Sequence, residues 1–305
     1  MSTSSSPASG SASPAPPRVS VLLVTYNHAA YIAQAVESVL AQQFDGGWEL
    51  VIGEDCSTDN TRTILQQFAQ REPGRIRLFS RERNLGLAGN LRAAWRACRG
   101  DYIAMLEGDD YWTSPHKLAR QVAALDVHPE WSMCFHRVQV TNEDGRTPFL
   151  EPYEDTFPTE SGLADILRRN FVGNVSTMYR RGIIPEVPES LQRVVQQDWP
   201  LHVLHARRGP IGYLPEVMGV WRHHGRSLWS SQPEAIRWQR MFEFYDLAED
   251  LLGPENLAAV RAARLESVRQ LCSDRERALQ SRDYRYGSAL LRPIRAVRKW
   301  FMVDR

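Results

Sequence analysis

The chain has 305 residues, of which 43% are hydrophobic, and its formal net charge at pH 7 is +1. This length suits one large domain or a domain with an appendage, and the balanced charge excludes the broad basic field typical of proteins that bind nucleic acid. No apolar run reaches the length of a membrane span, no basic and apolar leader follows Met1, and the four cysteines lack zinc or disulfide spacing, so we expect a cytoplasmic protein in a reducing compartment.

The first ordered element is expected near residue 18. Residues 1–17 are mostly Ser, Ala, Pro and Gly and predict a disordered tail. The apolar run Val19–Val24 is typical of a strand covered on both faces, and the polar residues Thr25, Tyr26 and Asn27 follow it directly. Apolar residues then recur at helical spacing and predict a helix: Ile32, Val36, Val39 and Leu40.

The alternation of strands and helices continues through three further predicted strands. A strand at 48–52 delivers Glu54 and Asp55, a strand at 76–79 precedes the loop that contains Asn84, and a strand at 102–106 precedes a group of acids. Alternating strands and helices predict an α/β protein with a doubly wound, mostly parallel sheet. Because ligands collect beyond the carboxyl ends of such strands, the polar clusters predict a nucleotide or phosphate site there.

The acids after the last of these strands are Glu107, Asp109 and Asp110. Carboxylates this close repel one another, and a divalent cation held with substrate phosphates is the usual reason to keep them. An acidic turn after a strand is the alternative. No glycine-rich phosphate loop follows the first strand, so a diphosphate at this edge needs a cation to neutralise it.

The second part of the chain has weaker patterns. We expect a helix from Ser114-Pro115, a strand at 131–141, an acidic Pro-rich loop at 146–160, a strand-like segment at 171–179 and a helix after Asp198. From residue 231 a helical C-terminal extension is predicted. Its last part, residues 290–301, mixes basic and apolar residues; it either lies on an anionic membrane or docks on the domain.

Four motifs occur in order, each after a predicted strand: Val24–Asn27, Glu54–Thr61, Asn84–Gly86 and Glu107–Asp110. Together they resemble the glycosyltransferase family 2 enzymes, which have the GT-A fold. The resemblance covers roughly residues 18–230, the expected glycosyltransferase domain, and leaves the tail and the extension outside its motifs. It implies an inverting transferase that uses a nucleoside-diphosphate sugar.

The resemblance also implies roles for single residues. Thr25 and Tyr26 match positions that frame the nucleotide base, Asp55 matches the acid that binds the base, and Asp109 lies near the ribose in the so-called DXD element. Asn27 and Asn84 belong to the same nucleotide-binding motifs. Asp110 matches the metal ligand, with His224 as a late ligand, although the adjacent His223 competes for that match. The expected cofactor is Mn²⁺ or Mg²⁺.

Asp198 matches the family's catalytic base, and Gln197 replaces the glutamate that usually precedes it. From local sequence alone, a helix N-cap before Trp199-Pro200 is the favoured interpretation of Asp198, and the family resemblance shifts it to catalysis. A single carboxylate suffices for direct displacement with inversion, whereas a retaining double displacement needs a second one as nucleophile.

The expected function is therefore metal-dependent sugar transfer, with UDP favoured as the nucleotide, to a saccharide or lipid-linked acceptor in bacterial polysaccharide or glycolipid assembly. The expected location is cytoplasmic, with peripheral contact to the inner membrane face through the basic C-terminus. Two alternatives remain. An inert nucleotide-sugar binding module is suggested by Gln197, and a nucleotidyltransferase is disfavoured because its phosphate loop is missing.

Overall fold

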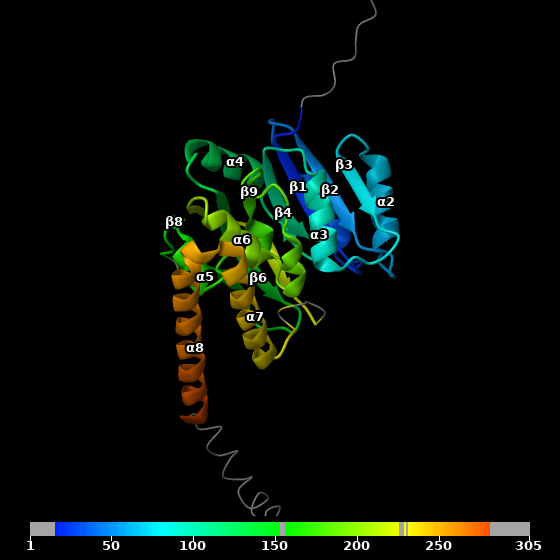
Figure 1. The fold of residues 1–305 in the computed structure, drawn as a ribbon. Helices are drawn as coiled ribbons and strands as arrows, with labels where there is room; N and C mark the ends of the chain where they lie inside the picture. Colours follow the sequence, from blue (N-terminus) through cyan, green and yellow to red (C-terminus); the bar gives the residue numbers. More distant parts are fainter. Residues whose placement is uncertain (1–15, 153–155, 226–228, 230, 281–305) are drawn as a thin grey trace, which may run out of the picture.

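The computed structural model describes residues 16–152, 156–225, 229 and 231–280 (Figure 1). Most of the predicted tail and the whole basic segment 290–301 lie outside these residues. Ten strands of the described chain form one mixed sheet with helices on both faces, which confirms the predicted α/β class and the doubly wound, mostly parallel sheet.

The N-terminal half of the sheet is fully parallel, in the order β3-β2-β1-β4. Its strands are β1 (Val19–Thr25), β2 (Trp48–Glu54), β3 (Ile76–Ser80) and β4 (Tyr102–Glu107). The connecting helices are α1 (Ile32–Leu40), α2 (Thr61–Arg71) and α3 (Gly86–Ala97). The carboxyl ends of all four strands therefore meet at one edge, as the sequence predicts.

The C-terminal half is mixed. β9 (Met178–Arg180) runs antiparallel between β4 and β6 (Met133–Asn142), and β10 (Ile211–His223) runs parallel to β6. Three short strands complete the sheet: β5 (Tyr111–Trp112), β7 (Phe149–Glu151) and β8 (Glu160–Ser161). One expectation was wrong: residues 171–179 are not a single strand, because the 3₁₀ turn η1 (Asn174–Ser176) precedes β9.

Two hydrophobic cores sandwich the sheet. Side chains alternate along β1, so that Val21 and Leu23 enter one core and Leu22 and Val24 the other. Helices α1, α2 and α4 (Lys117–Val127) cover the first core. The second is covered by α3 and by four later helices: α5 (Leu163–Arg168), α6 (Asp198–Ala206), α7 (Glu234–Leu252) and α8 (Leu257–Gln280).

Two further 3₁₀ turns, η2 (Glu189–Arg193) and η3 (Pro254–Asn256), precede α6 and α8. In Figure 1, α7 and α8 lie on the same side of the sheet as α5 and α6. Among the described residues, no helix is long and apolar enough to cross a membrane.

Candidate active site

All nine residues singled out from the sequence line one cleft of about 1280 Å³ at the carboxyl edge of the parallel strands. They come from β1 and its loop, from the loops after β2 and β3, from the turn after β4, from α6 and from the end of β10. They are Thr25, Tyr26, Asn27, Asp55, Asn84, Asp109, Asp110, Asp198 and His224. The fold therefore brings together every residue that the motifs predict.

The loops after β1 and β2 brace each other through Asn27. Its backbone has φ of 56°, a left-handed conformation that Asn tolerates better than most residues. The Asn27 N–H donates to Ser57 Oγ (3.0 Å), and its Oδ1 accepts from the Thr58 N–H (2.8 Å). Tyr26, next to it, borders the cleft with 42% of its surface exposed.

The loops after β2 and β3 meet at Asp55. Its Oδ1 accepts from the Leu85 N–H (2.8 Å), and the Asn84 side chain donates to the Asp55 carbonyl (3.0 Å). Burial raises the pKa of Asp55 even though these backbone donors favour the charged form. The carboxyl group is thereby held in one orientation at the cleft wall.

Three carboxylates follow β4. Oxygen atoms of Glu107, Asp109 and Asp110 all lie within 4.8 Å of one another. Burial and the neighbouring acids raise the pKa of Glu107 to about 8 and that of Asp110 well above its usual range. Burial alone would raise the pKa of Asp109, but the hydrogen bond from His224 Nε2 (3.0 Å), the charges of His28 and His224 and a backbone hydrogen bond together hold this pKa below its usual value.

These residues fit a divalent cation. Asp109 Oδ1 is buried and has no hydrogen-bond partner among the residues that the structure describes. Hard carboxylate oxygens are the ligands that Mg²⁺ and Mn²⁺ prefer. A cation among them would replace mutual repulsion by attraction, so the group has a physical reason to remain together.

The structure distinguishes the two adjacent histidines. His224 is buried against the cleft, with its ring 5.0 Å from the Tyr31 ring. His223 packs edge-on against Trp221 (4.5 Å between centroids) and does not line the cleft. His223 is the last residue of β10 and His224 directly follows the strand, and of the two rings it is that of His224 that reaches Asp109.

Asp198 opens α6 and lines the cleft. Its Oδ2 accepts a hydrogen bond from the Asn170 amide (2.9 Å). Burial raises the pKa of Asp198, which the Asn170 bond only partly offsets. The charge of Asp198 also contributes to the raised pKa of Glu107, so the acidic group and Asp198 interact across one cleft.

Asn170 is itself held by two donors. Its Oδ1 lies 3.2 Å from Nδ1 of His202 and accepts from the Val172 N–H (3.3 Å). Burial lowers the pKa of His202 to about 3, so this imidazole is neutral and its Nδ1–H can donate to Asn170. The amide oxygen is thus fixed toward His202, and the amide nitrogen toward Asp198.

Gln197 also borders the cleft, but its amide nitrogen bonds to backbone carbonyls and not to Asp198. Its side-chain nitrogen donates to the carbonyls of Leu191 (3.0 Å) and Val194 (2.6 Å), and so fastens η2 to the start of α6. An ionised glutamate has no hydrogen to donate to these carbonyls. These two bonds need the amide of Gln197, and the position therefore favours glutamine over an ionised glutamate.

Several residues of the site carry no predicted role. Gly108 has no room for a side chain, because an added Cβ would lie 2.4 Å from Thr25 Oγ1. His28 Nε2 lies 3.7 Å from Asp109 Oδ2, and the Asn174 amide hydrogen-bonds Glu107. Only Gly108 and His28 adjoin a recognised motif; Asn170 and Asn174 have no local signal in the sequence.

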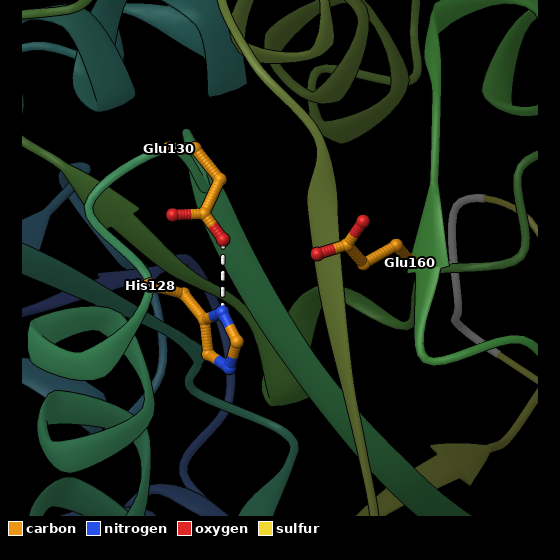
Figure 2. Close-up of side chains that lie close together, drawn as sticks. All are labelled: His128, Glu130 and Glu160. Atoms are coloured by element: carbon orange, nitrogen blue, oxygen red, sulfur yellow. Dashed lines mark hydrogen bonds and ion pairs between the residues drawn. The ribbon is translucent and has the colours of Figure 1, made fainter.

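A second carboxylate and histidine group lies away from the cleft (Figure 2). His128 Nδ1 lies 2.8 Å from Glu130 Oε1, and Glu160 faces them across the neighbouring strand. Glu160 accepts from the Trp131 indole (2.6 Å), and the His128 ring stacks on that indole at 4.0 Å. These contacts explain the group as an exposed brace for the strand ends.

Comparison with known proteins agrees with this architecture. The model of glycosyl transferase family 2 matches residues 20–188. The uncharacterized protein Rv1520 of Mycobacterium tuberculosis is 39% identical over 218 residues, which cover 70% of this chain and 61% of that protein. The chain thus spans about three fifths of the length of this relative. Since the family match covers more than half of the chain, the chain belongs to glycosyl transferase family 2.

Two solved structures share the fold. Residues 1–349 of S. aureus TarS in complex with UDP-GlcNAc have a TM-score of 0.56 at 19% identity, over 77% of this chain and 65% of that chain. The mannosyltransferase PcManGT from Pyrobaculum calidifontis, in complex with GDP-Man and Mn²⁺, has a TM-score of 0.58 at 17% identity, over 96% and 89% of the two chains. At this identity the similarity establishes the GT-A fold that the sequence predicts.

Proposed function

We propose that this protein is a metal-dependent inverting glycosyltransferase. It moves a sugar from a nucleoside-diphosphate sugar, with UDP as the favoured nucleotide, to a hydroxyl of a saccharide or lipid-linked acceptor in bacterial polysaccharide or glycolipid assembly. One observation carries the proposal: a single cleft holds a three-carboxylate group beside β4 and a separate carboxylate, Asp198, at the start of α6.

The donor half of the cleft would hold the nucleotide. Tyr26 and Thr25 frame the base, Asp55 binds it, and Asn27, Asn84 and Asp109 support the base and ribose. Asp110, with His224 nearby, would hold Mn²⁺ or Mg²⁺. When bound, such a cation neutralises the diphosphate charge that develops as the nucleotide leaves. The nucleotide sugars bound by TarS and PcManGT support this class of donor.

Asp198 would act as the general base. The acceptor hydroxyl gives its proton to Asp198 as its oxygen forms a bond to the anomeric carbon, and the bond from that carbon to the diphosphate oxygen breaks with its electron pair. A single displacement inverts the anomeric centre. The raised pKa of Asp198 suits this role, because a base is most effective when its pKa approaches the working pH.

A thermal-shift screen tests the donor site. The purified chain is heated with UDP-, GDP- and dTDP-sugars, with and without Mn²⁺. A ligand that binds only the folded state raises the midpoint of unfolding. We expect a metal-dependent rise with one nucleotide, largest for UDP, that Asp110→Asn abolishes and the exposed control Asp101→Asn retains.

Turnover of the selected sugar nucleotide then separates an enzyme from an inert binding module. Binding without transfer or hydrolysis under any acceptor condition favours the module. No binding by any sugar nucleotide contradicts the proposal altogether.

We also propose that the transferase domain spans residues 18–230, that the helical extension starts at 231, and that the basic segment near the C-terminus brings the protein to the cytoplasmic face of an anionic membrane. Co-sedimentation with vesicles of phosphatidylglycerol measures this contact. If a chain without residues 290–305 binds such vesicles as well as the full chain, the membrane role is wrong.

A further inference from the structure

The cleft is larger than a single substrate needs. Ligand pockets usually enclose about 300–1,000 Å³, whereas this cleft encloses about 1280 Å³. Past Asp198 its wall no longer comes from the sheet edge but from α5, α7 and α8. This second half contains no motif that the sequence analysis recognised.

One face of α7 lines that half. Glu234, Arg237, Trp238 and Met241 all border the cleft, and their spacing of three and four residues places them on one side of the helix. Ser267 and Gln270 of α8 border the cleft beside them.

This wall packs against α6, the helix that Asp198 opens. The Phe244 ring stacks on the Trp199 ring, with centroids 3.8 Å apart and planes inclined by 10°. Trp199 directly follows Asp198, and its indole donates to the Ile166 carbonyl (2.7 Å). The Tyr245 hydroxyl donates to the Leu167 carbonyl (3.0 Å) and lies 2.8 Å from Ser267 Oγ. Helices α5, α6, α7 and α8 therefore present one prearranged surface next to Asp198.

The side chains on this surface have a defined chemistry. Trp238 is only partly buried, and its ring lies 6.5 Å from the Phe242 ring in a stacked orientation. An indole face presented to a cleft suits the apolar face of a sugar ring. Arg237, one residue before, is exposed on the cleft, and its guanidinium forms no ion pair or hydrogen bond with any residue in the described parts of the chain.

Arg168 of α5, which also borders the cleft, shows the contrast. Its guanidinium lies 3.2 Å from Glu266 and 3.8 Å from Asp165, so its charge is already balanced. Arg237 keeps its donors available, and a guanidinium binds phosphate or carboxylate in a paired geometry.

We propose that α7 and α8 form the acceptor subsite and that it selects a saccharide with an anionic substituent, a phosphate or a carboxylate. The sugar ring lies on Trp238 and the anion binds Arg237, so that a hydroxyl of the same saccharide reaches Asp198. The inference rests on the proposed transferase function for the name acceptor, but the binding site itself is testable without turnover.

Ligand-observed NMR titration of the full chain tests it with three probes: methyl α-D-glucopyranoside, glucose 1-phosphate and glucuronic acid. Saturating UDP and Mn²⁺ are present, so that a probe cannot report on the donor half. We expect both anionic probes to bind at least about tenfold more tightly than the neutral glycoside, since a charge-assisted hydrogen bond contributes that much. A difference between the two anionic probes tells phosphate from carboxylate.

Variants assign the contact. Arg237→Gln should remove the preference for the anionic probes and leave the neutral glycoside unchanged, and Trp238→Ala should weaken all three. Arg269→Gln, an exposed arginine of α8 that does not border the cleft, is the matched control. Equal binding of charged and neutral probes, absence of binding by all three, or an Arg237→Gln variant that retains the preference would each overturn the inference. A separate titration of the same variants with UDP and Mn²⁺, before any probe is added, reports on the proposed function.

Discussion

The two halves of the cleft are built in different ways. In the donor half, each functional side chain follows its own strand at once: Thr25 ends β1, Asp55 follows β2 and Asp109 follows β4. In the other half, Asn170 lies in a loop, Asp198 opens a helix, and Trp238 lies on a helix forty residues further along the chain. One half is thus assembled by local chain direction in a parallel sheet, and the other by the packing of helices.

A single short turn joins the halves. The turn is η1. Trp112 donates its indole N–H to the Val175 carbonyl (2.9 Å), and the Gln121 amide donates to the Ser176 carbonyl (2.8 Å), so that two side-chain hydrogen bonds fix η1. Its first residue, Asn174, hydrogen-bonds Glu107. The position of the acids therefore depends on the packing of η1 as well as on the parallel strands.

The largest effect on the rate of transfer is expected for Asp198→Asn, which tests whether the two halves of the cleft have different functions. Asp198→Asn keeps the size of the side chain but removes the base, so transfer should fall roughly 10²- to 10⁴-fold, the usual contribution of general base catalysis. Binding of UDP with Mn²⁺, which uses the other half, should not change. Initial rates of nucleotide release and a thermal shift on the same preparation measure both.

The exposed Asp101→Asn is the control for the loss of one negative charge. If Asp198→Asn folds and transfers sugar at the rate of the unaltered protein, the base lies elsewhere, and the division of the cleft into donor and acceptor halves loses its main support.

An intermediate effect is expected at Asn170, which positions the base without touching substrate. Its amide donates to Asp198 and favours the charged form, so Asn170→Ala should raise the pKa of Asp198 further. A base must be deprotonated to act, and the acid limb of the rate profile should therefore move to higher pH, with transfer at pH 6 reduced about tenfold.

The pH profile distinguishes this role from a structural one. A lower rate at every pH with an unmoved acid limb would mean that Asn170 only supports the loop. Asn170→Gln, which retains the amide, should restore part of the unaltered profile.

The contrast between the halves also explains what the sequence could predict. Each strand that delivers a donor-half residue is a continuous apolar run, and parallel strands place their carboxyl ends together, so Asp55 and Asp109 could be placed near each other from pattern alone. The roles of Asp198 and His224 could be predicted only from the family resemblance. An acid before Trp-Pro is also typical of a helix N-cap, and a His-His pair does not show which histidine is the ligand. The choice of His224 over His223 needed the three-dimensional contacts of the two rings, since His224 reaches Asp109 whereas His223 packs on Trp221.

The remaining residues could not be predicted because their position depends on tertiary packing. Asn170 reaches Asp198 only after α5 and α6 have packed, and its neighbours in sequence, Arg169 and Phe171, give no sign of it. The strand expected at 171–179 failed for a related reason. Its composition suits a strand, but Trp112 and Gln121 bind the carbonyls of Val175 and Ser176 and hold a 3₁₀ turn instead.

The smallest effect on turnover is expected for a substitution of Lys117, which lies next to the residues that hold η1. Its effect on stability should be clear. The side chain is fully buried, donates to Gln121 Oε1 (2.6 Å) and lies 4.1 Å from the centre of the Trp112 ring, so it contacts both residues that hold η1. Burial lowers the pKa of Lys117 from 10.5 to about 7. It has no carboxylate partner among the described residues and does not border the cleft.

The sign of the pH dependence follows from this shift. Between pH 7 and 10.5 the unfolded chain binds the lysine proton more tightly than the folded chain, so the free energy of unfolding should rise with pH across that window. The rise should be on the order of a few kcal/mol. His136, whose pKa burial lowers well below 6.5, does not titrate there. Cys134 opposes the rise, because burial raises its pKa from 9.0 to about 12, so that above about pH 9 the unfolded chain loses this proton before the folded chain does. Since Cys134 is present in both proteins, the comparison with Lys117→Met isolates the contribution of the lysine. Urea unfolding at pH 7 and pH 10 should show a smaller rise for Lys117→Met than for the unaltered chain, with transfer at pH 7.5 nearly unchanged. An equal dependence of the free energy of unfolding on pH in both proteins would mean that the ammonium group is solvated in the folded protein. The pKa of Lys117 would then not be lowered by burial next to η1.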